Sequence, residues 1–600
     1  MSVFSQRILD GLVVVCGIWA CGSPVNAEDL LPPDRPIAEV IDHYIDLRLA
    51  AEGVTPAPQA RDATLVRRLT LDLEGRTPTA EEARSYVESA APDKRARLVD
   101  RLMSSPFYPR HAATDLDTML KGPDGTGPEL RDYLLDVTQE SRAWDRVFRE
   151  LIGETAARKK PERFVSGRVK NLDVLTRDVS AIFFGLNVTC CQCHTHPYVE
   201  TLTQDYFHGM KGFFSRSYEF EGELREKSFG PKIAYETGPG ESKDVGLMFL
   251  TGAKVETPQP NTDDLGKSIQ EEGKRIEELR KAYKEAEKVR TEALATVKKK
   301  EEEKKKLLAS EATPERAKVV AALDKEIEAE TATAEQVTFV YPESASYSYR
   351  NQLADIALRA ENDSLFARSI ANRLWHRLMG YGLVMRIDQM HGGNLGSHPE
   401  LLEWLARDMK THGYELRRLV RGIVSSRAYS RSSEWGPSDP RPPSKELFAV
   451  ANLRPLTPMQ YGVSVLLCGD PAFPPAEEAF EATIRGVEDA AREKFGAVIQ
   501  QPSDDLEISA DEALNISNDA ELLEHIGQKL VPELLKLEDR KEQIASAVWW
   551  VLSRPPTPEE LRILGEYVVE HTESEGARVE EAFQQVVWAL TTSAEFRFNH

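Results

Sequence analysis

The sequence predicts a mainly α-helical protein in which two helical lobes are joined by an irregular excursion and a coiled-coil-like helical hairpin. Apolar residues recur at helical spacing through most of the 600-residue chain. Residues 218–258 lack that periodicity and are rich in Gly, Glu and Lys. After residue 262 the composition changes abruptly to Glu, Lys and Ala in a heptad pattern. The length exceeds one ordinary domain, which agrees with two lobes.

The first helical domain is expected over residues 36–217. A helix at residues 37–51 is indicated by the apolar side chains of Val40, Ile41 and Tyr44. The same pattern predicts further helices at residues 63–73, 93–103, 129–140, 145–152, 172–186 and 204–214.

A short motif that starts a helix occurs twice. Thr79 and Glu82 have the spacing of a capping box shortly after Arg76, and residues 554–560 nearly repeat the motif. In the second copy Pro558 stands at the first helical position. We expect both segments to be the same helix-to-helix connector.

Two segments are predicted in the middle of the chain. An irregular insertion covers residues 218–261, with one strand expected at residues 245–250. A charged helical hairpin covers residues 262–337, because Ile276 and Tyr283 share a heptad position and a second helix starts after Thr313. The charge pattern favours a solvated spacer over an arm that binds a partner.

The second helical domain is expected over residues 345–600. Its apolar periodicity predicts helices at residues 350–360, 362–379, 400–412 and 416–429, one near residue 458, and two or three more after residue 539. Cys468 ends an apolar run, so its thiol is expected to be buried and inert.

The amino-terminal residues 1–27 have the features of a secretory signal peptide. Arg7 precedes an apolar run at residues 12–20, and small residues at 25–27 form a cleavage site. A lipoprotein box ending at Cys21 is the alternative, and the bulky Trp19 disfavours it. No later stretch is long enough for a transmembrane helix. We therefore expect export to the periplasm or cell surface.

The net charge is strongly negative. The chain has 98 acidic and 76 basic residues, which gives −22. A nucleic-acid-binding groove needs a positive surface, so this balance disfavours nucleic acid as a partner.

The most distinctive stretch is Cys190-Cys191-Gln192-Cys193-His194-Thr195-His196-Pro197. Cys190, Cys193 and His194 form the Cys-x-x-Cys-His pattern that attaches a c-type haem. The two thiols then bond to the porphyrin, and the imidazole is an axial ligand of the iron. Met210 and His208 are nearby candidates for the second axial position.

Two other interpretations of this stretch remain open. Cys190, Cys193, His194 and His196 are also a ligand set for zinc or a similar metal ion. Alternatively, the cysteines form a disulfide or are buried thiols without a cofactor.

Common catalytic motifs are absent from the sequence. It has no His-Glu-x-x-His, phosphate-loop or Gly-x-Ser-x-Gly pattern, so it does not establish an enzymatic activity. Residues 391–396 are rich in Gly, but no predicted strand precedes them. We expect a flexible connector there.

Two groups of motifs carry a resemblance to a known family. The first group is RLTLDLEGRTPT at 68–79, LTRDVS at 175–180, the Cys/His stretch and DYF at 205–207. The second group is DSLFAR at 363–368, NRLW at 372–375, SHPELL at 397–402, SRAY at 426–429 and SAEFRFNH at 593–600. The chain resembles planctomycete-type exported proteins that pair the cytochrome-c-associated domain of unknown function 1549 with the domain of unknown function 1553. The resemblance implies no established activity.

This chain departs from the family pattern in two ways. Thr195 stands where such proteins usually have Asp or Asn, and no cytochrome domain precedes the pair. If haem is carried, Cys190, Cys193 and His194 must carry it.

Two functions follow as hypotheses. The first is an exported protein with a haem c or metal site and a redox or electron-transfer role, acting with a redox partner. The second is a non-catalytic envelope or surface scaffold with a structural zinc or disulfide site, assembling with an envelope protein.

Overall fold

The computed structural model describes residues 30–153, 160–237, 240–258, 264–309, 312–436, 441–470, 473–496, 499, 529–573 and 578–600. The predicted signal peptide, including Cys21, lies outside these residues. The predicted fold class is confirmed: the described part of the chain is mainly helical, and its strands form two-stranded sheets. No helix in these ranges is both long enough and apolar enough to cross a membrane.

The first part of the chain forms a succession of short helices. They are α1 (Ile37–Glu52), α2 (Asp62–Glu74), α3 (Ala80–Glu88), α4 (Lys94–Ser104), α5 (Phe107–Leu120), α6 (Arg131–Gln139), α7 (Trp144–Ile152), α8 (Arg163–Ser166), α9 (Leu172–Phe184), the 3-10 helix η2 (Thr189–Gln192) and α10 (Gln204–Gly212). The capping box predicted at Thr79 and Glu82 is present at the start of α3. Helix α5 was not predicted, and Pro109 lies in its first turn.

The predicted irregular insertion contains three short antiparallel pairs. They are β1 (Ser217–Phe220) with β2 (Glu223–Glu226), β3 (Ala234–Glu236) with β4 (Ser242–Asp244), and β5 (Leu247–Met248) with β6 (Lys254–Val255). The strand expected at 245–250 is therefore only two residues long.

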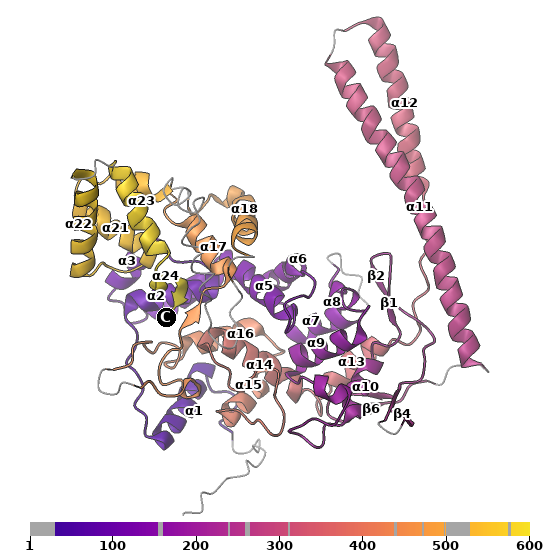
Figure 1. Ribbon diagram of the computed structural model, residues 1–600, viewed down its shortest axis with the longest axis horizontal. Coiled ribbons are helices and arrows are strands. Elements are labelled where there is room, and N and C mark those ends of the chain that lie inside the picture. Colours follow the sequence, from indigo (N-terminus) through magenta and orange to yellow (C-terminus); the bar gives the residue numbers. More distant parts are fainter. Residues whose placement is uncertain are drawn as a thin grey trace, which may run out of the picture.

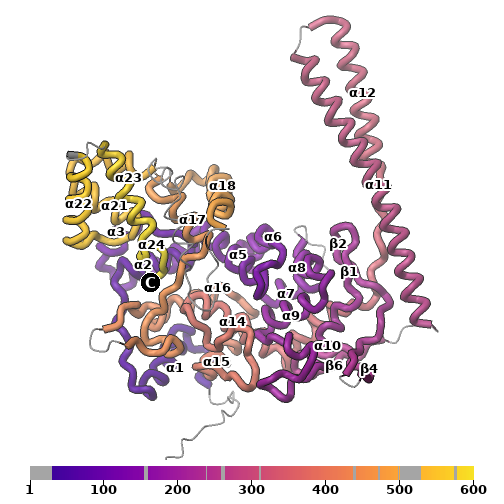
Figure 2. Tube along the Cα trace, in the orientation of Figure 1, coloured from indigo at the N-terminus to yellow at the C-terminus, as the bar shows by residue number. Residues whose placement is uncertain are grey.

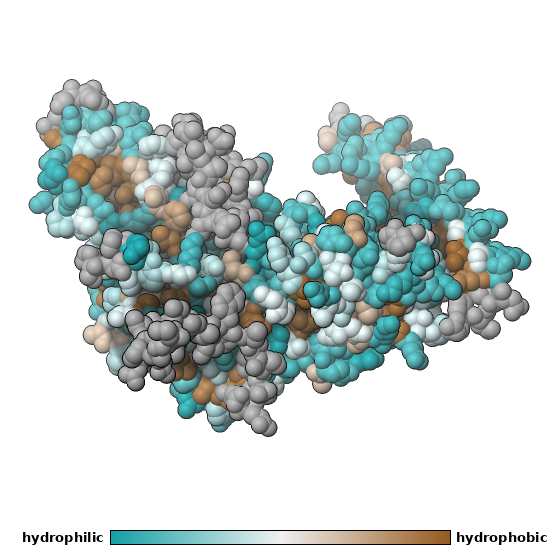
Figure 3. All heavy atoms as spheres, turned by 60° about the horizontal axis from the view of Figure 1, so that its bottom comes forward, coloured by the Kyte–Doolittle hydropathy of each residue, from teal (hydrophilic) through white to brown (hydrophobic). Residues whose placement is uncertain are grey.

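A long helical hairpin follows the insertion. Helix α11 (Leu265–Leu308) packs against α12 (Pro314–Gln336), and Figures 1 and 2 show the pair projecting far from the rest of the molecule. Thr313 caps α12 by accepting a hydrogen bond from the Arg316 N–H at 3.1 Å. The face in Figure 3 is largely hydrophilic, including the hairpin, with scattered apolar patches.

The rest of the chain returns to the body of the molecule. Its elements are α13 (Tyr349–Ala357), α14 (Ser364–Met379), α15 (Pro399–Thr411), α16 (Leu416–Ser425), η3 (Lys445–Leu447), β7 (Arg454–Pro455), α17 (Pro458–Leu467), α18 (Glu477–Phe495), α21 (Arg540–Leu552), α22 (Pro558–Glu573), α23 (Val579–Thr591), α24 (Ala594–Arg597) and β8 (Phe598–Asn599). Strand β8 pairs antiparallel with β7.

One hydrophobic core is shared by the two halves of the sequence. Helix α9 packs against α14, and the ring of Phe148 lies 4.8 Å from that of Phe183 and 5.1 Å from that of Phe366. This core extends from Ile37 to Ala449, while residues after 455 form a second core with Leu71. The main core therefore includes both halves of the sequence up to residue 449, because α9 and α14 bury their apolar faces against each other.

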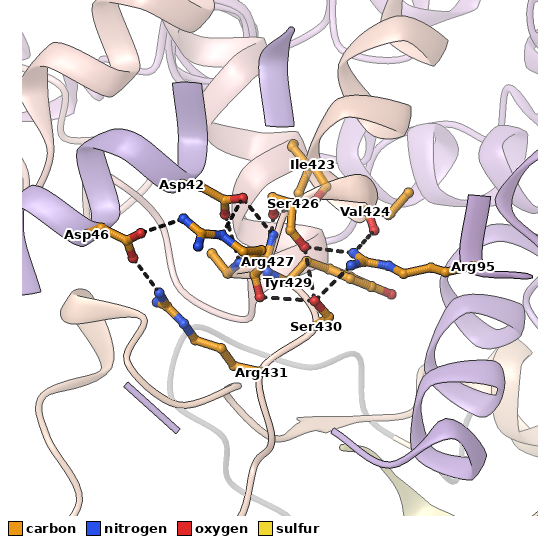
Figure 4. A network of polar contacts seen from close by, with 11 residues as sticks. Asp42, Asp46, Arg95, Ile423, Val424, Ser426, Arg427, Tyr429, Ser430 and Arg431 are labelled. Atoms are coloured by element: carbon orange, nitrogen blue, oxygen red, sulfur yellow. Dashed lines mark hydrogen bonds and ion pairs between the residues drawn. The ribbon is translucent and has the colours of Figure 1, made fainter. Parts of the chain in front are cut away.

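A polar network joins α1 and α4 to the loop after α16 (Figure 4). Asp42 accepts hydrogen bonds from the backbone N–H groups of Arg427 at 3.1 Å and Ala428 at 3.0 Å. Asp46 accepts from the side chains of Arg427 at 2.7 Å and Arg431 at 2.8 Å. The network satisfies loop N–H groups that would otherwise be buried without partners.

A second polar joint ties three distant segments together. The buried carboxylate of Asp72 on α2 accepts hydrogen bonds from the Tyr429 hydroxyl at 2.6 Å, the Arg454 guanidinium at 2.7 and 2.8 Å, and the Asn599 amide at 2.8 Å. The first half, the second half and the C-terminus therefore meet at one charge.

Candidate haem or metal site

The Cys/His stretch begins where α9 is fastened to the second half of the chain. Gly185 ends α9 with φ of 62°, and its carbonyl accepts a hydrogen bond from the Met390 N–H at 2.8 Å. The Asn187 N–H donates to the Asp388 carbonyl at 2.7 Å. A Cβ at Gly185 would lie 2.4 Å from the Met390 sulfur, so only glycine permits this approach.

The cysteines lie on a tight turn that local hydrogen bonds hold in place. Asn187 Oδ1 accepts from the Thr189 N–H at 3.0 Å, and η2 follows. The Cys191 N–H donates to the Val188 carbonyl at 2.9 Å. These bonds fix which side chains of the turn face the protein interior and which face solvent.

The three cysteines of the turn have different environments. Cys191 is fully buried, and its thiol donates to the Leu202 carbonyl at 3.4 Å. Burial raises the pKa of Cys191 to about 11, which keeps it protonated and unreactive. Cys190 and Cys193 are exposed free thiols. The two cysteines of the Cys-x-x-Cys-His pattern are thus the accessible ones.

His194 contacts the backbone of the residue that follows it. The side chain is exposed, and its Nδ1 lies 2.7 Å from the Thr195 carbonyl oxygen. Because a carbonyl only accepts, this contact is a hydrogen bond when Nδ1 carries a proton, and in that neutral tautomer Nε2 has the lone pair. Metal-binding histidines usually donate their second nitrogen in this way.

His196 lies on a different side of the turn. It is 8% exposed, and its backbone N–H donates to the Leu202 carbonyl at 2.8 Å. Its Nδ1 accepts a hydrogen bond from the Tyr198 N–H at 3.3 Å. Its ring lies 5.1 Å from that of His391, between centroids. Burial and the neighbouring His194 lower the pKa of His196.

The two predicted second axial ligands have different accessibility. Met210 is completely buried in the main core. His208 is partly buried, stacks on Tyr235 with centroids 4.5 Å apart, and has its Nε2 3.3 Å from the Gln192 carbonyl oxygen. His208 contacts the cysteine turn through Gln192.

The four residues proposed as a zinc site do not surround one point in this conformation. Within the residues that the structure describes, no three His, Cys, Asp or Glu side chains are placed to hold a metal ion. A c-type haem makes different demands, since it needs two accessible thiols and one imidazole on the same turn. Cys190, Cys193 and His194 fit those demands.

His391 is a site residue that the sequence did not reveal. The Gly-rich segment 391–396 was expected to be a flexible connector, but it is held by hydrogen bonds. The Asn394 N–H donates to the His391 carbonyl at 2.8 Å, and the Asn394 amide donates to the carbonyls of Met385 at 2.9 Å and Gln389 at 3.1 Å. A lone histidine beside glycines carries no sequence signal for this contact.

Comparison with known proteins finds two family models in the chain. Residues 40–219 match PSCyt2, a protein of unknown function (DUF1549), and residues 349–471 match PSD1, a protein of unknown function (DUF1553). No curated protein and no solved structure matches the chain. The cysteine turn lies in the first matched region and His391 in the second.

Proposed function

We propose that this protein, which pairs a PSCyt2 domain with a PSD1 domain, is an exported haem c protein that takes part in electron transfer. Cys190 and Cys193 would hold the haem covalently, and His194 would bind its iron. When bound, the haem supplies one-electron redox chemistry. The observation that carries the proposal is the outward placement of these three side chains while the neighbouring Cys191 is buried.

The orientation of His194 supports this function. Its Nδ1 is occupied by the Thr195 carbonyl at 2.7 Å, so Nε2 is the nitrogen available to iron. The preset tautomer lowers the entropic cost of binding, because the ring does not have to find a new partner.

The accessibility of the thiols favours haem over a closed zinc site. Zinc in a structural site needs four converging ligands, and three such groups do not converge here within the described chain. Thioether attachment instead requires that each thiol be reachable from outside, as Cys190 and Cys193 are.

His208 is the better of the two candidates for the second axial position. Its ring lies beside the turn, with Nε2 3.3 Å from the Gln192 carbonyl. Met210 would have to leave the core to reach a haem on the surface, and exposing a buried methionine costs about 2 kcal/mol.

Exposure around the turn supports a redox partner that docks there. Tyr198 is 80% exposed and follows the turn closely. An exposed aromatic ring beside a redox group suits transient protein–protein contact.

The test is to produce the protein in a host that attaches haem c. We expect a Soret band, a reduced α band and a mass increase of one haem per chain. Cys190→Ser/Cys193→Ser should lose covalent attachment, because no thioether can form, whereas the matched variant Cys191→Ser should keep it. If the unaltered chain gains no haem while a known cytochrome c matures in the same cells, the proposal is wrong.

A structural role for the Cys/His turn is the second candidate. The backbone bonds from Asn187 to Asp388 and from Met390 to Gly185 fasten the turn to the other half of the chain. This anchoring suits an envelope scaffold in which zinc or a disulfide stabilises the joint. Stoichiometric zinc in the purified protein, together with unfolding on chelation, would favour this function over the first.

A further inference from the structure

We propose that His196 and His391, together with the backbone carbonyl of Tyr198, form a binding site for a divalent transition-metal ion between the two domains. This site goes beyond the proposed haem function and does not depend on it. It uses neither of the exposed thiols nor His194.

The separation of the two imidazoles suits a shared ion. Their ring centroids are 5.1 Å apart, and the rings are inclined by 60°. Two imidazoles bound to one tetrahedral ion, each through a nitrogen about 2.1 Å from it, have centroids about 5 Å apart. The rings are thus at the required separation without movement of the backbone.

His391 has a nitrogen that needs a partner. Its Nδ1 is buried and has no hydrogen-bond partner among the described residues. An unpaired polar atom in a protein interior costs free energy and is usually satisfied by a water molecule or an ion.

Gly393 leaves room beside this nitrogen. A Cβ added at Gly393 would lie 3.3 Å from Nδ1 of His391 and 3.4 Å from the carbonyl oxygen of Tyr198. Two electron-pair donors therefore both lie close to a position that the side chain of any other residue would occupy. An imidazole nitrogen and a carbonyl oxygen are both common ligands of divalent metal ions.

His196 can supply the third ligand through Nε2. Ligation there moves the ring proton to Nδ1, where it replaces the 3.3 Å contact with the Tyr198 N–H. That contact is at the long end for a hydrogen bond, so little is lost.

The test is calorimetric titration of the full chain with Zn²⁺, in a Cys190→Ser/Cys193→Ser background that removes competing thiols. We expect one ion per chain. His391→Gln and Gly393→Ala should each weaken binding at least tenfold, the first by removing a ligand and the second by filling the space. Because no haem is attached in this background, the result is separate from the test of the haem proposal.

Two control variants make the test specific. A Cβ at Gly392 would have no atom within 4 Å, so Gly392→Ala should bind Zn²⁺ as the parent does. His43 is exposed on α1, far along the chain, and His43→Ala should also leave the affinity unchanged. Unaltered affinity in both His391→Gln and Gly393→Ala would overturn the proposal. So would a loss of binding in Gly392→Ala as large as that in Gly393→Ala.

Discussion

The two copies of the Arg-x-Pro-Thr-x-Glu-Glu connector have the same internal bonds in different surroundings. Between α2 and α3, Arg76 donates to both carboxylate oxygens of Glu82, at 2.8 and 3.0 Å. Between α21 and α22, Arg554 donates to both oxygens of Glu560, at 2.9 and 2.7 Å. In each copy the glutamate also accepts from the threonine N–H, at 2.8 Å for Thr79 and 2.7 Å for Thr557.

The difference lies in burial. The Arg76 side chain is 5% exposed, pairs with the buried Glu74, and lies 5.0 Å from the ring centre of Phe107. The Arg554 side chain is 23% exposed and pairs with Glu595, which is 31% exposed. The heptapeptide thus determines a local structure, while its surroundings determine how much stability depends on it.

Removal of the arginine should produce the largest difference in stability between the two copies. Arg76→Ala leaves the buried carboxylate of Glu74 without its partner and leaves Glu82 with Arg101 alone, and we expect a loss of about 3–5 kcal/mol in the free energy of unfolding. Arg554→Ala leaves carboxylates that water can reach, and we expect about 1 kcal/mol. Urea unfolding of the two variants checks the difference, and equal losses would contradict it.

Acid titration should reveal one glutamate, in the buried copy only, whose contribution to stability has the opposite pH dependence. Hydrogen bonds from Arg554 lower the pKa of Glu560 to about 2. Burial alone would raise the pKa of Glu82, but Arg76 outweighs burial and lowers it to about 2. Both contributions to stability are complete above pH 4.5 and are lost as the pH falls from 4.5 toward 2.

Glu74 behaves in the opposite way, because burial raises its pKa. The contribution of Glu74 to the free energy of unfolding is complete below its pKa in the unfolded chain. It is lost as the pH rises through its higher pKa in the folded chain. The stability advantage of the parent over Glu82→Gln and Glu560→Gln should therefore shrink below pH 4.5. The stability of Glu74→Gln relative to the parent should instead rise as the pH rises. Thermal unfolding of the three variants across this pH range measures both trends. The expectation is contradicted if the stability of Glu74→Gln relative to the parent changes with pH in the same direction as that of the other two variants.

Loss of the helix cap should affect the two copies equally. Thr79 Oγ1 accepts from the Glu82 N–H at 3.2 Å, and Thr557 Oγ1 accepts from the Glu560 N–H at 3.1 Å. Thr79→Ala and Thr557→Ala should each cost about 1 kcal/mol, since the bond lies within one turn of chain. If the losses in the free energy of unfolding of the two variants differ by more than about 1 kcal/mol, the cap is not a local feature.

Local patterns in the sequence predicted most of the helices. The apolar periodicity placed α1, α2, α4, α9 and α14 within a few residues of their observed bounds. Helix α5 was missed because Pro109 near its start and a mixed polar composition weaken the pattern. The strand expected at 245–250 was mostly wrong, because an apolar run of six residues does not specify a strand partner.

The candidate site was predictable only in part. Cys190, Cys193 and His194 stand out by their spacing, which needs no knowledge of the fold. The burial of Cys191 and Met210 depends on which segments pack over them. His391 is far from the turn in the sequence and reaches His196 only because residues 388–390 pair with 185–187.

The sequence by itself determined the helical class, the two connectors and the Cys-x-x-Cys-His spacing of the cysteine turn, because each depends on residues within a few positions of one another. Tertiary structure alone decided that the two matched regions share one core, that Asp72 joins three distant segments, and that imidazoles from the two matched regions lie 5.1 Å apart, between centroids. The physical reason is that such contacts form when separate apolar faces are buried together, and a linear pattern does not state which faces meet.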